Sequence, residues 1–232
     1  MDNPIVRKKP INTLNLSQVD ALLCTPQTDQ ELAILHLLVG HGWRQIEVRR
    51  VTAGDVGRVK DGQIWCRGKE RDEWTPILPE TQELLERLAV DKGGDDILFL
   101  GNRKGRPEPF GETGIAHSIA RLFEQARIEG FKGHDLRRTF VTMVTEASGD
   151  ELLGMRLARD RVPGVNDRYV RRDLVGPLAR FSPIRQAGNL PIEKNGTPPP
   201  DQTGESELIA GGDGGGSKPT ATKYIRETVE GN

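Results

Sequence analysis

GHDLRRTFVTMVTEASGDELLGMRLARDRVPGVNDRY, residues 133–169, is the stretch of sequence that predicts the fold most directly. It reads as a helix, a Gly-Asp break, a second helix and a Pro-Gly turn that leads to Tyr169. His134 and Arg137 are three residues apart, so both side chains face the same way at the start of the first helix. Tyr169 is one of only two tyrosines in the chain. A histidine, a permanently charged arginine and a tyrosine are suited to nucleophilic attack on a phosphodiester.

Length and composition indicate one folded domain with an appendage. The chain has 232 residues, of which 35% are hydrophobic, together with 27 glycines and 15 prolines. Its net charge is −1, but residues 188–232 hold four basic and seven acidic residues, which leaves 29 basic and 27 acidic residues in 1–187. This excess of +2 is small, so a nucleic-acid surface would have to be a local basic patch.

The chain is expected to have three segments. Residues 1–27 predict an N-terminal arm with a short helix that Ser17 caps. Residues 28–187 contain the predicted helices and strands of the folded domain. In residues 188–232, Gly, Pro and acidic residues cannot bury enough surface to offset chain entropy, so this tail is predicted to be disordered.

The cysteines and the apolar runs indicate a cytoplasmic protein. Cys24 and Cys66 have neither metal-ligand spacing nor an even-numbered framework, so structural roles in a reducing compartment are expected. No apolar run approaches the roughly 18 residues that cross a bilayer, and the N-terminus does not read as a signal peptide. The prediction is a soluble chain without a membrane partner.

The apolar segment 30–42, QELAILHLLVGHG, predicts a buried core helix in which His36 is a core or boundary residue. Arg44 follows the Gly-His-Gly break, at the start of the next helix. Because arginine is rarely buried without a partner, two interpretations remain open. Arg44 pairs with a carboxylate such as Glu47, or it faces a cleft that awaits an anion.

Three short segments with strand character follow, at 55–59, 63–67 and 74–78, and an Asp-Gly turn signal separates the first two. They predict a small three-stranded antiparallel sheet in an otherwise helical α+β chain. The loop between the last two segments carries Lys69. This lysine is either a solvated edge charge or a mobile cationic arm that reaches a ligand.

A basic loop at 101–111, with Arg103, Lys104 and Arg106, precedes a helix that contains His117. Such a loop is either solvated or follows a phosphate backbone. His117 is expected at the surface.

Five residues, taken in chain order, resemble the catalytic set of the tyrosine recombinase (phage integrase) family: Arg44, Lys69, His134, Arg137 and Tyr169. Each one has its family context, namely GHGWRQIEVRRVTAGDV, RGKERDEWTPILP and GHDLRRTFVT for the first four. Tyr169 lies 35 residues after His134, close to the family's interval. The resemblance covers about residues 28–180 and implies the family's mainly helical catalytic domain.

The resemblance also implies a role for each residue. Arg44 and Arg137 would hold the non-bridging phosphate oxygens, and Tyr169 would attack to give a 3′-phosphotyrosyl link. His134 would accept a proton or hydrogen-bond the phosphate, and Lys69 would protonate the leaving 5′ oxygen. The link conserves bond energy, so no cofactor and no metal are expected.

The implied partner is double-stranded DNA, with contacts from Arg103, Lys104, Arg106 and Arg138. Family members also imply self-association in a tetrameric synapse and an accessory DNA-bending or directionality protein. Strand exchange is the implied reaction. The alternatives are a non-cleaving DNA-binding relative and a type IB topoisomerase, although the GHDLRRT motif favours a recombinase over a topoisomerase.

Two departures support the non-cleaving alternative. Asp160 stands nine residues before Tyr169, where the family usually has a histidine, and a carboxylate there would repel a phosphate. Arg159 and Arg161 are candidates for the missing donor. In addition, only about 27 residues precede the first matching helix, where family members usually carry a helical DNA-clamping domain.

Overall fold

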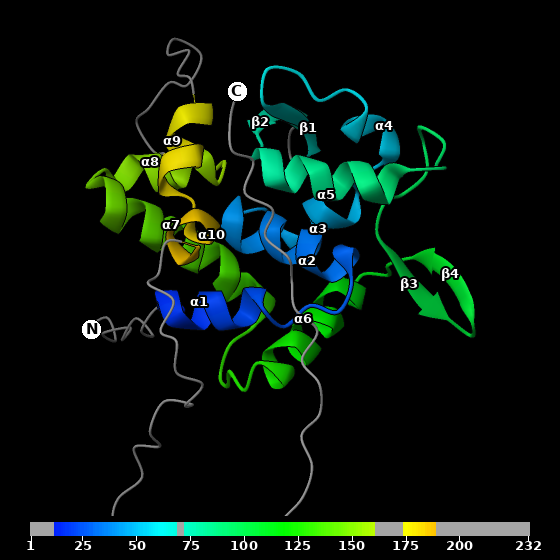
Figure 1. Ribbon diagram of the computed structural model, residues 1–232, viewed down its shortest axis with the longest axis horizontal. Coiled ribbons are helices and arrows are strands. Elements are labelled where there is room, and N and C mark those ends of the chain that lie inside the picture. Colours follow the sequence, from blue (N-terminus) through cyan, green and yellow to red (C-terminus); the bar gives the residue numbers. More distant parts are fainter. Residues whose placement is uncertain (1–11, 69–71, 161–173, 189–232) are drawn as a thin grey trace, which may run out of the picture. The chain divides into compact units, whose positions relative to one another are not determined.

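The computed structural model describes residues 12–68, 72–160 and 174–188 (Figure 1). Its elements, in chain order, are α1 (Leu16–Leu23), α2 (Asp29–Leu35), the π-helical turn η1 (His36–Gly40), α3 (Gln45–Arg49), α4 (Ala53–Val56), β1 (Gln63–Arg67), β2 (Asp72–Pro76), α5 (Pro79–Ala89), β3 (Leu100–Arg103), β4 (Arg106–Pro109), α6 (Gly114–Gln125), α7 (Gly133–Ser148), α8 (Glu151–Leu157), α9 (Val175–Phe181) and α10 (Pro183–Ala187).

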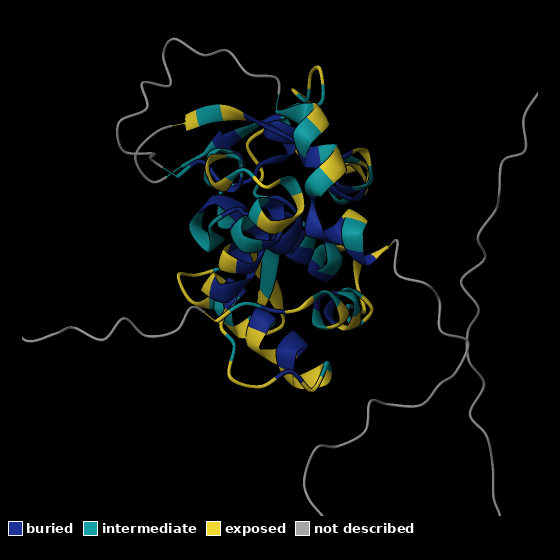
Figure 2. Ribbon diagram, turned by 90° about the vertical axis from the view of Figure 1, so that its left-hand side faces the viewer, coloured by how far each residue is buried: buried dark blue, intermediate teal, exposed yellow. Residues whose placement is uncertain are grey.

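The centre of the fold is the predicted core helix, which runs through α2 and η1 and packs against α5, α7 and α10. Most of its apolar side chains are fully buried, including Ile34, Leu35, Leu37 and Leu38. In Figure 2, dark blue segments of this kind lie inside the molecule, and exposed residues line its periphery. The prediction of a buried helix over 30–42 is therefore confirmed.

The turn after η1 sets the path of the chain into α3. Buried His41 donates from Nδ1 to the carbonyl of His36 at 2.9 Å, and its Nε2 accepts from the Leu78 N–H at 3.1 Å. Burial lowers the pKa of His41 to about 3, so this ring stays neutral. Gly42 has φ +65°, and a Cβ on it would lie 2.4 Å from the Phe140 ring. A glycine is required here because α3 begins directly against α7.

The predicted three-stranded sheet is wrong in its first strand. Residues 53–56 form the short helix α4, and β1 and β2 pair as a two-stranded antiparallel sheet. The cause is local: Thr52 and Asp55 form a capping box, with Thr52 Oγ1 accepting from the Asp55 N–H and Asp55 Oδ2 accepting from the Thr52 N–H. The Asp61-Gly62 turn does form, with φ of +52° and +70°, and joins α4 to β1.

The basic loop is a β-hairpin. β3 and β4 pair antiparallel with Arg103 opposite Arg106, and the turn residues Lys104 and Gly105 have φ of +53° and +79°. Positive φ at both central residues matches the twist of a tight hairpin, which favours glycine at one of them. The prediction of a loop is therefore wrong for this stretch. Each strand has only four residues, which is too short to show a clear alternation of apolar and polar side chains.

Helix α7 contacts both the first and the last described segments of the chain. The Leu14 N–H donates to buried Thr139 Oγ1 at 2.9 Å, and α1 packs against α10. The cap of α1 is Asn15 and not the predicted Ser17, because Asn15 and Gln18 form a capping box at 2.8 and 3.0 Å.

The remaining expectations about the fold concern single residues and the termini. His36 is a half-buried boundary residue, within the prediction of a core or boundary position: it bonds Thr81 Oγ1 at 3.1 Å, and burial lowers its pKa to about 4. Both cysteines are free thiols, and burial raises the pKa of Cys66 to about 12. The tail from 189 onward and residues 1–11 lie outside the described residues. No helix in the described part is long and apolar enough to cross a bilayer.

Candidate active site

Arg44 is positioned by the first turn of α3. It is the N-cap residue, and its N–H donates to Glu47 Oε2 at 2.7 Å while its Nη1 donates to Glu47 Oε1 at 3.0 Å. Only 1% of the Glu47 side chain is exposed, whereas 37% of the Arg44 side chain is. The pairing with Glu47 confirms one of the two interpretations of Arg44.

The second interpretation, a cleft that awaits an anion, stays a prediction, but Arg44 does face a second carboxylate. Its Nη2 donates to Asp160 Oδ1 at 2.8 Å, across a sequence separation of 116 residues. Here the anion is a carboxylate of the same chain. Arg44 thus has one buried carboxylate behind it and one partly exposed carboxylate in front.

Arg137 reaches the same carboxylate oxygen from α7. Its Nη2 donates to Asp160 Oδ1 at 2.6 Å, and further bonds run from Nη1 to the Gly42 carbonyl and from Nη2 to the Ala158 carbonyl. Only 5% of this side chain is exposed. Burial lowers the pKa of Arg137 and the charge of Asp160 opposes that shift, so the guanidinium keeps its proton at neutral pH. Backbone carbonyls therefore fix this cation in orientation.

Asp160 Oδ1 thus accepts from two guanidinium groups at 2.8 and 2.6 Å. We call Arg44, Arg137 and Asp160 the two-arginine site. The Asp160 side chain is 35% exposed, so the site opens to solvent on its side. Two convergent arginines bind a dianionic or monoanionic oxygen group strongly, and they suit a phosphate as well as a carboxylate.

Arg159 does not replace the hydrogen-bond donor that Asp160 lacks. It is buried with φ +61°, donates from Nη2 to Glu47 Oε2 and from Nη1 to Thr75 Oγ1 at 3.1 Å, and lies 5.2 Å from the Trp43 ring centroid. The Arg159 guanidinium is therefore already bonded to Glu47 and to strand β2. Arg161, the other candidate, lies outside the described residues.

His134 lies in the first turn of α7, one turn before Arg137, and its side chain is exposed. Partial burial, followed by the charges of Arg138 and Arg137, lowers its pKa below the ordinary value. Asp135 and Asp160 oppose this shift. At neutral pH the ring is thus uncharged and able to accept a proton.

Residues 12–160 match the family model described as the Phage integrase family. The chain belongs to this family. It is 29% identical over 166 residues to the tyrosine recombinase XerC of Actinobacillus pleuropneumoniae serotype 7 (strain AP76), which is 65% of this chain and 53% of XerC. The chain thus spans about half the length of this curated relative.

Solved structures show the same fold. The integrase from mycobacterium phage Brujita superposes with a TM-score of 0.61 at 18% identity, over 80% of this chain and 63% of that one. XerH site-specific recombinase, bound to palindromic difH substrate in a post-cleavage complex, gives 0.55 at 18% identity over 75% and 52%. The predicted fold class, a mainly helical recombinase-type domain with small antiparallel sheets, is confirmed.

Other residues predicted for the phage integrase site stay predictions. Lys69 and Tyr169 lie outside the described residues. The strand that leads to Lys69 is anchored, since Arg50 Nη1 donates to the Gly68 carbonyl and Arg67 Nη2 donates to Asp55 Oδ1 at 3.1 Å.

The four predicted DNA contacts are spread over two elements. Lys104 and Arg106 are exposed on the β3–β4 hairpin, and Arg103 is in β3. Arg138 is exposed on α7 and donates to Asp135 Oδ1 at 2.9 Å. Their contact with DNA stays a prediction.

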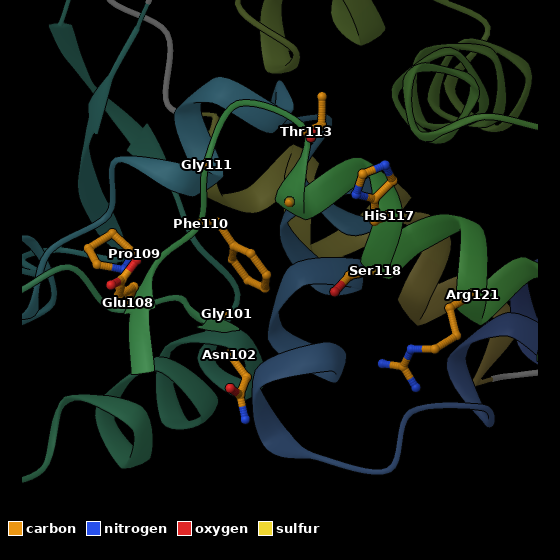
Figure 3. A pocket seen from close by; sticks show the side chains of 11 residues that line it. Gly101, Asn102, Glu108, Pro109, Phe110, Gly111, Thr113, His117, Ser118 and Arg121 are labelled. Atoms are coloured by element: carbon orange, nitrogen blue, oxygen red, sulfur yellow. The ribbon is translucent and has the colours of Figure 1, made fainter. Parts of the chain in front are cut away.

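A pocket of about 670 Å³ lies between this hairpin and α6 and was not predicted from the sequence (Figure 3). Phe110 lines the pocket and packs closely against Gly101 and Gly114. A Cβ on these glycines would lie 3.0 and 2.4 Å from the Phe110 ring. His117 lines the pocket and is exposed, as predicted. Among the described residues, no group of three or more His, Cys, Asp or Glu could hold a metal ion.

Proposed function

We propose that this chain is the catalytic domain of a site-specific DNA recombinase that cleaves by tyrosine attack. The observation that carries the proposal is the convergence of Arg44 and Arg137 on one anionic oxygen at 2.8 and 2.6 Å. A DNA phosphate in that position would offer its non-bridging oxygens to two cations that cannot lose their charge. Charge grows on those oxygens in the transition state, so fixed cations lower the barrier.

The reaction balances with residues of this chain. The Tyr169 phenolate oxygen forms a bond to phosphorus, and the bond from phosphorus to the 5′ oxygen breaks. His134, neutral at pH 7, takes the phenol proton, and Lys69 gives a proton to the leaving oxygen. The 3′-phosphotyrosyl link retains the energy of the phosphodiester, so a 5′ hydroxyl of a second strand can attack it and complete the exchange.

The partner under this proposal is double-stranded DNA. The solved XerH recombinase is bound to its palindromic difH substrate, and the exposed cations Lys104, Arg106 and Arg138 offer phosphate contacts here. A tetrameric synapse and an accessory DNA-bending or directionality protein belong to the same proposal. So does a cytoplasmic location, where chromosomal and plasmid DNA is accessible.

A non-cleaving DNA-binding relative is the second candidate. Asp160 favours it, because its carboxylate fills the position that the phosphate would need. An active enzyme has to move or neutralise this group, whereas a DNA-binding relative does not. The type IB topoisomerase alternative has no comparable observation in its favour.

The test is covalent capture. Cells that express the full chain are lysed in denaturant, protein-linked DNA is collected and sequenced, and the enriched site is rebuilt as a nicked substrate for the purified chain. We expect an adduct on a denaturing gel with wild type and with Tyr224→Phe, the matched control, and none with Tyr169→Phe. An adduct that persists in Tyr169→Phe refutes the nucleophile. If wild type yields no more protein-linked DNA than Tyr169→Phe, the non-cleaving relative is favoured.

A further inference from the structure

The guanidinium hydrogens that converge between Arg44 and Arg137 are already donated to Asp160. Both hydrogens on Arg137 Nη2 are donated, one to the Ala158 carbonyl and one to Asp160 Oδ1. Arg44 donates from Nη1 to Glu47 and from Nη2 to Asp160. A phosphate oxygen that approached both cations would therefore meet Asp160 Oδ1 in its place.

We propose that Asp160 is an internal competitor of the phosphate. Its carboxylate holds Arg44 and Arg137 in position while no DNA is bound, and it has to leave before the phosphate enters. Two anions cannot share this space, since like charges a few ångströms apart repel strongly in a partly desolvated site. The inference rests on the proposed function only in taking the incoming anion to be a DNA phosphate.

Burial distinguishes the carboxylate that can leave from the one that cannot. Glu47 is 1% exposed and accepts from the Arg44 N–H, the Arg44 guanidinium and the Arg159 guanidinium. Asp160 is 35% exposed, and the bonds that its carboxylate accepts from side chains of the described residues both end on Oδ1. Water can therefore replace the contacts of Asp160 at far lower cost than those of Glu47.

Two effects follow for the phosphate. The Arg44 and Arg137 side chains are already fixed in one rotamer, so a phosphate that replaces Asp160 does not have to order them and avoids that entropy cost. Against this, the phosphate binds only the fraction of molecules in which Asp160 has left, and its apparent affinity falls by that fraction. Asp160 thus lowers phosphate affinity while it keeps the site in its working geometry.

The first test uses inorganic sulfate as the probe and needs no DNA. The melting temperature of the full chain is measured against sulfate concentration at constant ionic strength for wild type, Asp160→Asn, and Asp160→Asn combined with Arg44→Gln. Asp95→Asn, an exposed position in the loop before Leu98, is the matched charge control. It also reports the general stabilising effect of sulfate.

The expected result is that Asp160→Asn needs about tenfold less sulfate than wild type for the same stabilisation. The gain should disappear in the double variant, and Asp95→Asn should match wild type. An equal or weaker response of Asp160→Asn overturns the inference. So does a gain that survives Arg44→Gln, because the sulfate would then bind elsewhere.

The second test repeats the covalent capture from cells, with Asp160→Asn beside wild type. A larger adduct yield together with tighter sulfate binding supports both proposals. Tighter sulfate binding without an adduct from any variant keeps the competitor and refutes the cleavage function. An adduct from wild type with an unchanged sulfate response keeps the cleavage function and refutes the competitor.

Discussion

The buried pair behind the two-arginine site and a pair on the outer helices join the same two residue types in different surroundings. Arg159 and Glu47 are 6% and 1% exposed, whereas Arg185 and Glu80, which join α10 to α5 at 2.7 Å, are 42% and 37% exposed. The charges are identical and the contact is close in both. Water can replace a lost partner at the outer pair but cannot reach the inner one. Burial therefore decides which carboxylate this fold depends on.

The largest effect is expected from Glu47→Gln. It removes the close, buried counter-charge of Arg159 and leaves only Glu73, whose Oε1 lies 3.9 Å from Arg159 Nε, and loss of one partner of a buried pair costs about 3–5 kcal/mol. Chemical denaturation of the full chain measures the free energy of unfolding. Glu80→Gln is the matched control on the outer pair and should cost less than about 1 kcal/mol. Equal losses in the two variants would show that burial does not separate the two regions.

Arg44→Lys tests the front of the same site. Lysine keeps the charge but loses the planar fork that holds Glu47 and the anion together. We expect adduct formation to fall by about 10²–10³-fold, as for the loss of one transition-state donor. Arg87→Lys, at an outer pair with Asp29, is the control and should cleave at the wild-type rate. Full activity in Arg44→Lys would mean that only its charge matters.

The third effect is a loss of stability in mild acid, due to buried His41. Its pKa is about 3 in the folded chain and ordinary, near 6.5, in the unfolded chain. The unfolded state therefore binds more protons below pH 6.5, and stability falls as the pH drops from there towards 3. Between pH 7 and pH 5 this residue should account for roughly 2 kcal/mol.

The check is denaturation at both pH values with His41→Gln, whose amide can accept from the Leu78 N–H and donate to the His36 carbonyl. We expect this variant to lose less stability between pH 7 and pH 5 than wild type. His117→Gln, at an exposed position, is the control and should follow wild type. If His41→Gln keeps the full pH dependence, another group is responsible for it.

The sequence predicted the parts of this comparison that depend on short spacing. His134 and Arg137 share a helix start, as their three-residue spacing predicted, and the pair of Arg44 with Glu47 was one of the two interpretations that the sequence left open. The core helix was equally clear from its apolar run. These features are local, and the structure adds only their coordinates.

The parts that could not be predicted depend on distant or competing contacts. Asp160 was expected to repel a phosphate, but nothing in its neighbourhood showed that its carboxylate would be held by Arg44, 116 residues earlier. Arg159 was predicted as a candidate donor to the phosphate, but the structure buries it beside Glu47, to which it donates. Helix α4 was mistaken for a strand because a capping box outweighs β-propensity over four residues.

The smallest effect is expected at the outer pair itself. A double-mutant cycle with Glu80→Gln and Arg185→Gln should give a coupling of about 0.2–1 kcal/mol, although the fork of Arg185 binds both Glu80 oxygens at 2.7 Å. The coupling should shrink in 1 M salt, since both side chains meet solvent and the screening length falls to about 3 Å. Hydrogen bonding to Arg185 keeps the pKa of Glu80 low despite partial burial, so the coupling should also vanish in acid as Glu80 protonates. A coupling above 2 kcal/mol that persists in salt would mean that geometry, and not burial, separates strong pairs from weak ones in this fold.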